Sequence, residues 1–166
     1  LMQRGSAFLG APLAIVGGAM TWISERHLVA AISNGGGFGI LACGSMPPDR
    51  LREEIKGTQA LTGKSFGVNL ITMHPDLDAL IQVCLDEKVS HIVLAGGLPA
   101  APAVKKVKDG GAKLICFAPA VAVGDGVDVL MEVTPGDVLP GLSALDALVT
   151  GTSTADPARA DAVKAI

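Results

Sequence analysis

The sequence predicts an α/β fold in which parallel strands are joined by helices. Apolar residues make up 49% of the 166 residues and charged residues only 17%, which excludes a disordered chain. Glycine is abundant, at 21 residues, and aromatic residues are rare, at 3%, a composition that suits strands buried between helices. Short apolar runs also recur along the first 117 residues and start 22 to 28 residues apart, which is the spacing of βα units.

Five apolar runs have the composition of buried strands: residues 13–16, 38–42, 66–71, 91–95 and 113–117. A sixth run, residues 127–133, begins only 14 residues after the fifth begins. The segment between them is too short for a crossover helix, which needs roughly a dozen residues. The last candidate strand is residues 147–150, and residues 155–166 form a candidate closing helix.

The first expected helix follows the loop after residue 16. Ser24 is suited to cap it, because a serine hydroxyl accepts hydrogen bonds from the first free amides of a helix. Leu28, Ala31 and Ile32 fall on one face, which we expect to be buried. An Asn-Gly-Gly-Gly run at residues 34–37 ends this helix.

Three further helices are expected. The first of them starts at a Pro-Pro pair, buries Leu51 and Ile55, and turns Glu54 to the solvent with its charged neighbours. Residues 75–88 have the clearest helical periodicity, with apolar residues three and four positions apart. Residues 102–108 form the last helix before the fifth strand.

The spacing leaves two architectures open, a doubly wound open sheet and a closed (β/α)8 barrel. A barrel normally takes ~250 residues, and the segments between the strands expected after residue 117 are too short to hold crossover helices. We therefore expect residues 1–166 to be one domain of a longer fold from which segments after about residue 117 are absent. The alternative is a half-barrel fragment.

Composition and charge exclude several other classes. The net charge is −3 and there is no basic run, which argues against nucleic acid as a partner. No apolar stretch reaches the ~18 residues of a membrane span. Cys43, Cys84 and Cys116 are odd in number and widely spaced, which predicts reduced thiols in a cytoplasmic protein and offers no zinc site.

Small and polar residues at strand ends are the candidate binding residues. Residues 17–21 directly follow the first strand, and Ala95-Gly96 end the fourth; small residues there let a ligand approach the backbone. Asn69 is the only polar residue in its strand, and its carboxamide can hydrogen-bond either a flat heteroaromatic ring or the neighbouring backbone.

Other polar residues give weaker signals. A Gly-Thr pair at residues 151–152 can offer N–H groups and a hydroxyl to a phosphate. His27, His74 and His91 have no serine, cysteine or acidic residue at a spacing typical of a catalytic pair. We therefore expect these histidines to be structural or solvated.

Four segments carry a resemblance to a known family. They are residues 12–23 (PLAIVGGAMTWI), 30–39 (AAISNGGGFG), 46–55 (MPPDRLREEI) and 67–70 (GVNL). With the strand end at Ala95-Gly96, they resemble the nitronate monooxygenases (formerly 2-nitropropane dioxygenases), which have the FMN-dependent enoyl-acyl-carrier-protein reductases as close relatives. The resemblance runs through residues 8–117 and continues in islands at 126–130, 147–152 and 155–157.

The resemblance implies a (β/α)8 TIM barrel that binds FMN. Carried over to this sequence, the implied cofactor-binding residues are Ala19, Met20, Thr21, Asn69, Ala95, Gly96, Phe117, Gly151 and Thr152. Met20 would pack near the isoalloxazine, Asn69 would face the flavin, and Gly151-Thr152 would lie at the phosphate.

The sequence departs from the family in three places. The Gly-Gly segment that the family has at its phosphate site is missing. Many relatives have glutamine where Gly17 stands. The family also follows its Gly-Val-Asp strand with an Ala-Gly-Gly-His-like segment whose histidine is the base or contacts the substrate, whereas here no histidine follows His91. The resemblance therefore assigns no catalytic residue in this chain, and His74 does not take that place.

The activity implied by the resemblance is that of an FMN-dependent oxidoreductase. Such an enzyme oxidises alkyl nitronates, derived from nitroalkanes, with O2 to carbonyl compounds and nitrite. NAD(P)H-dependent enoyl-thioester reduction is the alternative within the flavoenzymes, and the fold alone also admits another phosphorylated ligand. A non-catalytic half-barrel is the alternative outside them, and its exposed sheet edges would drive association of copies of the chain.

Overall fold

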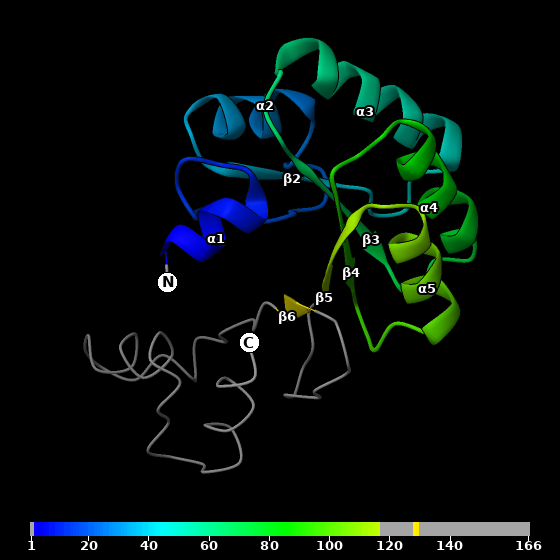
Figure 1. Ribbon diagram of the computed structural model, residues 1–166. Coiled ribbons are helices and arrows are strands. Elements are labelled where there is room, and N and C mark those ends of the chain that lie inside the picture. The colour runs from blue at the N-terminus through cyan, green and yellow to red at the C-terminus, as the bar shows by residue number, and fades with distance from the viewer. Residues whose placement is uncertain (1, 117–127, 130–166) are drawn as a thin grey trace, which may run out of the picture.

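Six parallel strands lie side by side in the order of the sequence (Figure 1). The computed structural model describes residues 2–116 and 128–129. The strands are β1 (Val16–Gly17), β2 (Phe38–Ala42), β3 (Gly67–Ile71), β4 (His91–Ala95), β5 (Lys113–Cys116) and β6 (Asp128–Val129). The helices are α1 (Met2–Leu9), α2 (Arg26–Asn34), α3 (Pro48–Leu61), α4 (Leu77–Asp86) and α5 (Ala101–Asp109).

This arrangement is part of a (β/α)8 barrel. Each of the first five strands pairs with the next strand along the chain, and a helix connects each pair up to β5. The predicted fold class is therefore confirmed. No helix in residues 2–116 and 128–129 has the length and apolar character needed to cross a membrane.

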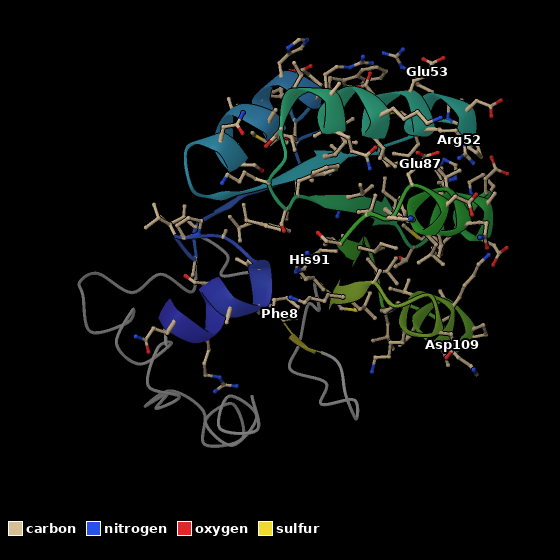
Figure 2. The ribbon with its side chains drawn as sticks, turned by 45° about the horizontal axis from the view of Figure 1, so that its top comes forward. Phe8, Arg52, Glu53, Glu87, His91 and Asp109 are labelled. Carbon is tan, nitrogen blue, oxygen red and sulfur yellow. The ribbon has the colours of Figure 1, made fainter. Side chains whose placement is uncertain are left out.

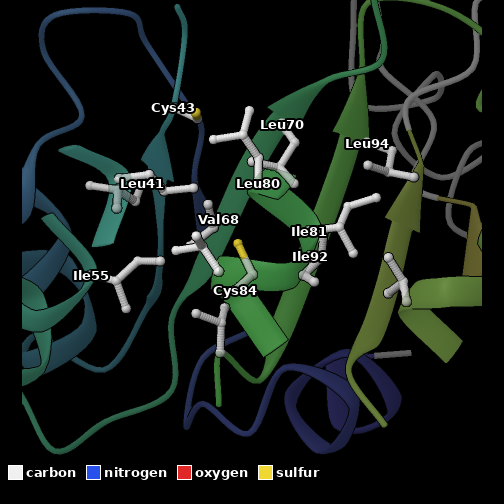
Figure 3. Packing of buried hydrophobic residues seen from close by; sticks show 14 of the residues in the cluster. Leu41, Cys43, Ile55, Val68, Leu70, Leu80, Ile81, Cys84, Ile92 and Leu94 are labelled. Carbon is white, nitrogen blue, oxygen red and sulfur yellow. The ribbon is translucent and has the colours of Figure 1, made fainter. Parts of the chain in front are cut away.

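One face of the sheet packs against helices α2 to α5 (Figures 1 and 3). Alternate strand residues point to this outer face, because side chains in a strand alternate between its two sides. The strands contribute Leu41, Val68, Leu70, Ile92 and Leu94, and the helices contribute Leu51, Ile55, Leu80, Ile81 and Cys84. All ten side chains are buried, which makes this the main hydrophobic core.

The other face of the sheet, the inner face of the barrel, is covered by α1 at the N-terminal ends of the strands. Phe38, Ile40, Val93 and Ile115 form this second cluster with Leu9 of α1. His91 points toward Phe8 (Figure 2), and its Nε2 donates to the Phe8 carbonyl oxygen at 2.8 Å. The structural role expected for His91 is therefore confirmed. Helix α1 itself was not expected from the sequence.

The predicted N-cap of α2 is wrong by one residue. Glu25, not Ser24, caps the helix, and its carboxylate accepts hydrogen bonds from the amides of His27 and Leu28 at 3.0 Å. A carboxylate also stabilises the positive end of the helix dipole. Ser24 is used instead to close the preceding loop.

The predicted buried face of α2 is wrong in part. Of its residues, Leu28 and Ile32 are half-buried but Ala31 is exposed, and the fully buried residues are Val29, Ala30 and Ser33. The cause lies in β2, because a Cβ atom added to Gly39 would be only 2.5 Å from the Val29 carbonyl oxygen. Glycine in the strand thus lets the helix backbone approach, and this close contact sets the rotation of α2.

Glu54 was expected to face the solvent, and this prediction is wrong. Its side chain is only 4% exposed, between α2 and α3. Both carboxylate oxygens accept hydrogen bonds from Arg26, at 2.7 and 3.0 Å, and Arg50 adds another at 2.7 Å. These partners compensate the cost of burying the charge.

Two predicted strands differ in their bounds. The first was expected at residues 13–16 but is assigned at Val16–Gly17. The amide of Leu13 nevertheless bonds to Gly36 and that of Phe38 to Ile15, so this segment runs beside the start of β2. β6 lies within the predicted sixth run, whereas the run at 147–150 and the helix at 155–166 lie outside the described residues.

Candidate functional site

The candidate site lies at the C-terminal ends of the parallel strands. The loops that follow these ends meet at one edge of the sheet because all the strands point the same way. This is the edge that carries the active site in (β/α)8 barrels. The loops in question are residues 18–25 after β1, 43–47 after β2, 72–76 after β3 and 96–100 after β4.

The loop after β1 is held in shape by Ser24. The Ser24 hydroxyl accepts a hydrogen bond from the Met20 amide and donates one to the Gly18 carbonyl oxygen, both at 2.9 Å. The Ser24 carbonyl oxygen accepts a bond from the Ala42 amide at 3.0 Å, which fastens the loop to the end of β2. Ala19 packs on the inner cluster, while Met20 remains about half exposed.

Asn69 lies on the inner face of the sheet. It stands between Val68 and Leu70, which both point to the outer core, and it is in register with Ala42 and Val93 of the neighbouring strands. The side chain is half-buried, and its carboxamide has no hydrogen-bond partner among the residues that the structure describes. A partly buried amide normally has a partner. Asn69 is therefore suited to bind a polar group of a ligand.

The ends of β3 and β4 place a second unpaired polar group at this edge. The Thr72 amide bonds to the Ala95 carbonyl oxygen at 2.8 Å, but the buried Thr72 hydroxyl has no partner within the described residues. Gly96 and Gly97 have φ angles of +88° and +154°, and a Cβ on Gly97 would lie 3.2 Å from the Thr72 oxygen. Thr72 was not expected from the sequence to be a binding residue, although a polar residue at the end of a buried strand indicates a possible ligand contact.

Gly17 and Gly18 face opposite sides. A Cβ on Gly17 would lie 2.4 Å from Cδ1 of Ile32, so residue 17 points into α2 rather than toward the inner face. A Cβ on Gly18 would meet nothing within 4 Å. The backbone at Gly18 is therefore open on this side.

The structure brings together six of the residues predicted to bind the cofactor. Ala19, Met20, Thr21, Asn69, Ala95 and Gly96 all lie at the C-terminal edge or on the adjoining inner face. The other three predicted residues, Phe117, Gly151 and Thr152, lie outside the described residues.

The remaining histidines do not extend the site. His74 Nδ1 accepts a hydrogen bond from the Asp76 amide at 3.0 Å, which holds the turn before α4. His27 is exposed on α2. These positions agree with the structural or solvated roles expected from the sequence.

The three cysteines are free and buried, in agreement with the predicted reduced thiols. Burial raises the pKa of Cys43 to about 11, and it also raises the pKa values of Cys84 and Cys116. These groups therefore remain protonated thiols at neutral pH and are poor nucleophiles. The described residues contain no group of three or more His, Cys, Asp or Glu side chains able to hold a metal ion.

Comparisons with known proteins identify the family. Its sequence model, described as nitronate monooxygenase, matches residues 4–134. A nitronate monooxygenase of Paraburkholderia phytofirmans is 27% identical over 148 residues, which cover 66% of this chain and 40% of that protein. A Mycobacterium tuberculosis protein named (3aS,4S,5R,7aS)-5-hydroxy-7a-methyl-1-oxo-octahydro-1H-indene-4-carboxyl-CoA dehydrogenase is 33% identical over 103 residues, covering 61% of this chain and 28% of the relative.

The structure is also similar to solved structures. FabK from Thermotoga maritima superposes with a TM-score of 0.68 at 36% identity, over 71% of this chain and 38% of FabK. The chain thus spans only about a quarter to two fifths of the length of these relatives. The match to the family model over most of the chain, together with the partial barrel, places this chain in the nitronate monooxygenase family.

Proposed function

We propose that this chain is the FMN-binding part of an enzyme that oxidises alkyl nitronates with O2 to carbonyl compounds and nitrite. The observation that carries the proposal is the carboxamide of Asn69, which lies on the inner face of the barrel without a partner among the described residues. The family, and the small residues at the ends of β1 and β4, support it. FMN, when bound, would supply the redox chemistry by accepting an electron from the nitronate.

The residues of the chain would position both the cofactor and the substrate. Asn69 has a donor and an acceptor with which to bond the polar edge of the flavin ring. Gly18, where an added Cβ would meet nothing within 4 Å, leaves room for the ring to approach the backbone, and Ala19 forms part of the apolar inner surface. Met20, about half exposed, would cover the ring and keep water away from it.

The substrate itself reduces the need for a base. A nitronate has already lost the proton from its carbon, so its oxidation requires binding of an anion rather than removal of that proton. His74 and His91 are both engaged in structural hydrogen bonds. The proposal therefore gives neither of them a catalytic role.

Two measurements on the protein, purified as its host makes it, test this function. A denaturing mass spectrum records the polypeptide mass and any released small molecule, and FMN is expected among the released species. Addition of the nitronate of nitroethane should then cause O2 uptake and nitrite formation without NAD(P)H. A protein that neither retains nor binds FMN, or that consumes no O2 with nitronates, would contradict the proposal.

The Asn69→Leu variant tests the residue on which the proposal depends. Leucine keeps the size but removes the hydrogen bonds, and the affinity for FMN should fall about tenfold, which corresponds to ~1.4 kcal/mol. The control is Gln82→Leu on the exposed side of α4, which should bind FMN as the wild type does. Equal FMN affinity in the two variants, measured by flavin fluorescence, would remove Asn69 from the site.

Enoyl-thioester reduction is the second candidate, favoured by the likeness to FabK. The two functions differ in their electron donor. Rapid bleaching of the flavin absorbance by NAD(P)H, without O2 uptake on nitronates, would favour the reductase.

A further inference from the structure

The loop after β1 presents the most exposed large apolar side chain in the part of the chain that the structure describes. Trp22 is 86% exposed, and Ile23 beside it is 57% exposed. Tryptophan is highly buried on average in folded proteins. Two exposed apolar neighbours on one loop therefore indicate a surface that a partner covers.

The backbone at Trp22 is also strained. Its φ angle is +68°, in the left-handed region that bulky residues rarely adopt. The loop is locked in this form, because the amides of Ile23 and Ser24 both bond to the Met20 carbonyl oxygen, at 3.0 and 2.8 Å. Such strain persists only where the surrounding structure imposes it, and it is concentrated at functional positions. The fold thus holds the indole rigidly outward, which reduces the entropy lost when a partner buries it.

A hollow of about 280 Å3 adjoins the indole. Trp22 forms one wall, and the loop after β2 and the start of α3 contribute Ser45, Met46, Pro47 and Arg50. Tryptophan, methionine and arginine are the kinds of side chain that are enriched at protein–protein interfaces. The composition of this surface therefore favours a protein as the partner.

The projecting indole and the hollow lie next to each other on one surface, as a two-fold interface requires. In such an interface both copies use the same patch, so a projection on one copy must meet a hollow on the other. Charges of both signs line the hollow, since it includes Glu25 as well as Arg50. Two copies of this surface can therefore face each other without meeting as surfaces of like charge.

We propose that this surface joins two copies of the chain about a two-fold axis, with each Trp22 indole seated in the hollow of the other copy. The indole would lie at the centre of the interface, where tryptophan is common among the few residues that carry most of the binding energy. The proposal does not depend on the function proposed above, because neither Trp22 nor Ile23 is among the residues expected to bind the cofactor.

Sedimentation equilibrium measures the association directly. Trp22 reports it independently by fluorescence, because it is the only tryptophan of this sequence. On dilution, the average mass should fall from that of two chains toward that of one. The emission of Trp22 should move to longer wavelength over the same range of concentration, since the indole returns to water when the copies separate.

The Trp22→Gly variant separates association from folding. Glycine adopts a positive φ without strain, so at dilutions where the wild type is monomeric the variant should unfold at no lower urea concentration. Its dissociation constant for the dimer should nevertheless rise about tenfold or more. Ser45→Phe, whose ring would occupy the hollow, should weaken the dimer likewise. The control is Leu61→Ala, at an exposed apolar position at the other end of α3, which should leave the dimer unchanged.

Two results would overturn the proposal at once: a chain that stays monomeric at the highest concentration it tolerates, or a Trp22→Gly variant that dimerises as tightly as the wild type. The rival interface is β1, which lies at the edge of the described sheet. Leu13 and Ile15 beside this edge are 46% and 57% exposed. A dimer that Ile15→Lys abolishes and Trp22→Gly leaves intact would assign the contact to that edge and contradict the role of Trp22.

Discussion

Ser24 and Glu54 are buried polar side chains whose oxygens all have hydrogen-bond partners. Each joins segments that approach the candidate site. Ser24 closes the loop that carries Ala19, Met20 and Thr21, and Glu54 joins the start of α2 to α3. Such groups contribute to stability mainly through what is left unpaired when they are removed.

The Ser24→Ala substitution is therefore expected to be destabilising. It would leave the Met20 amide and the Gly18 carbonyl oxygen without their partner, at a cost of about 1–3 kcal/mol in the free energy of unfolding. Urea denaturation measures this loss, with Ser45→Ala, at an exposed serine of the next loop, as the control. If the two variants unfold at the same urea concentration, Ser24 does not hold the loop.

At the scale of the elements, α2 and β2 meet at an unusually close contact. Gly39 has no side chain, and the Val29 carbonyl oxygen occupies the space that a side chain would need. Val29 and Ala30 are both buried at this contact. The close approach of the helix backbone to Gly39 therefore determines which face of α2 packs on the sheet. The loop after β1 leads directly into α2, so the contact also determines where the loop begins its path to the site.

The Gly39→Ala substitution tests this contact. A methyl group 2.5 Å from the Val29 oxygen would force α2 away from β2, and we expect a loss of about 1–3 kcal/mol in the free energy of unfolding. Gly63→Ala is the matched control, because a Cβ there meets nothing within 4 Å. Equal urea midpoints for the two variants would show that α2 can shift at no cost.

Residues 38–42, 66–71, 91–95 and 113–117 could be predicted as strands because burial on both faces leaves continuous apolar runs. Asn69 could be singled out for the same reason, as the polar exception in such a run. The burial of Glu54 could not be predicted, since it depends on Arg26 of another helix. Helix α1 was missed because its sequence, MQRGSAFL, contains polar residues and a glycine, and it is held by contacts with distant strands.

At the scale of the whole molecule, the two ends of the sheet have different roles. At the N-terminal end, α1 covers the inner face, and the Phe8 and Phe38 rings lie edge-on to His91 at centroid distances of 5.3 and 4.7 Å. At the C-terminal end lie the loops of the candidate site. One end thus stabilises the barrel interior, and the other is available for a ligand. His91 connects α1 to the strands, so its protonation state bears on the stability of the whole arrangement.

The stability of the protein should therefore depend on pH through His91. Burial lowers the pKa of His91 from its ordinary value of 6.5, whereas in the unfolded chain the ring takes up its proton near that value. Between 6.5 and the lowered pKa the unfolded state binds more protons, so the stabilisation by neutral His91 is present above pH 6.5 and is lost as the pH falls below it. Urea midpoints at about pH 7.5 and about pH 5.5 bracket the start of this loss.

The His91→Gln variant separates this effect from other titrations. Glutamine has no proton to gain in this range, so the fall in stability between the two pH values should be smaller than in the wild type, whatever the variant's overall stability. His27→Gln, at an exposed position of α2, should keep the pH dependence of the wild type. If His91→Gln loses as much stability between the two pH values as the wild type does, the pH effect does not come from His91. The His91 ring would then not need to stay neutral against Phe8, and its protonation would not weaken the contact between α1 and the strands.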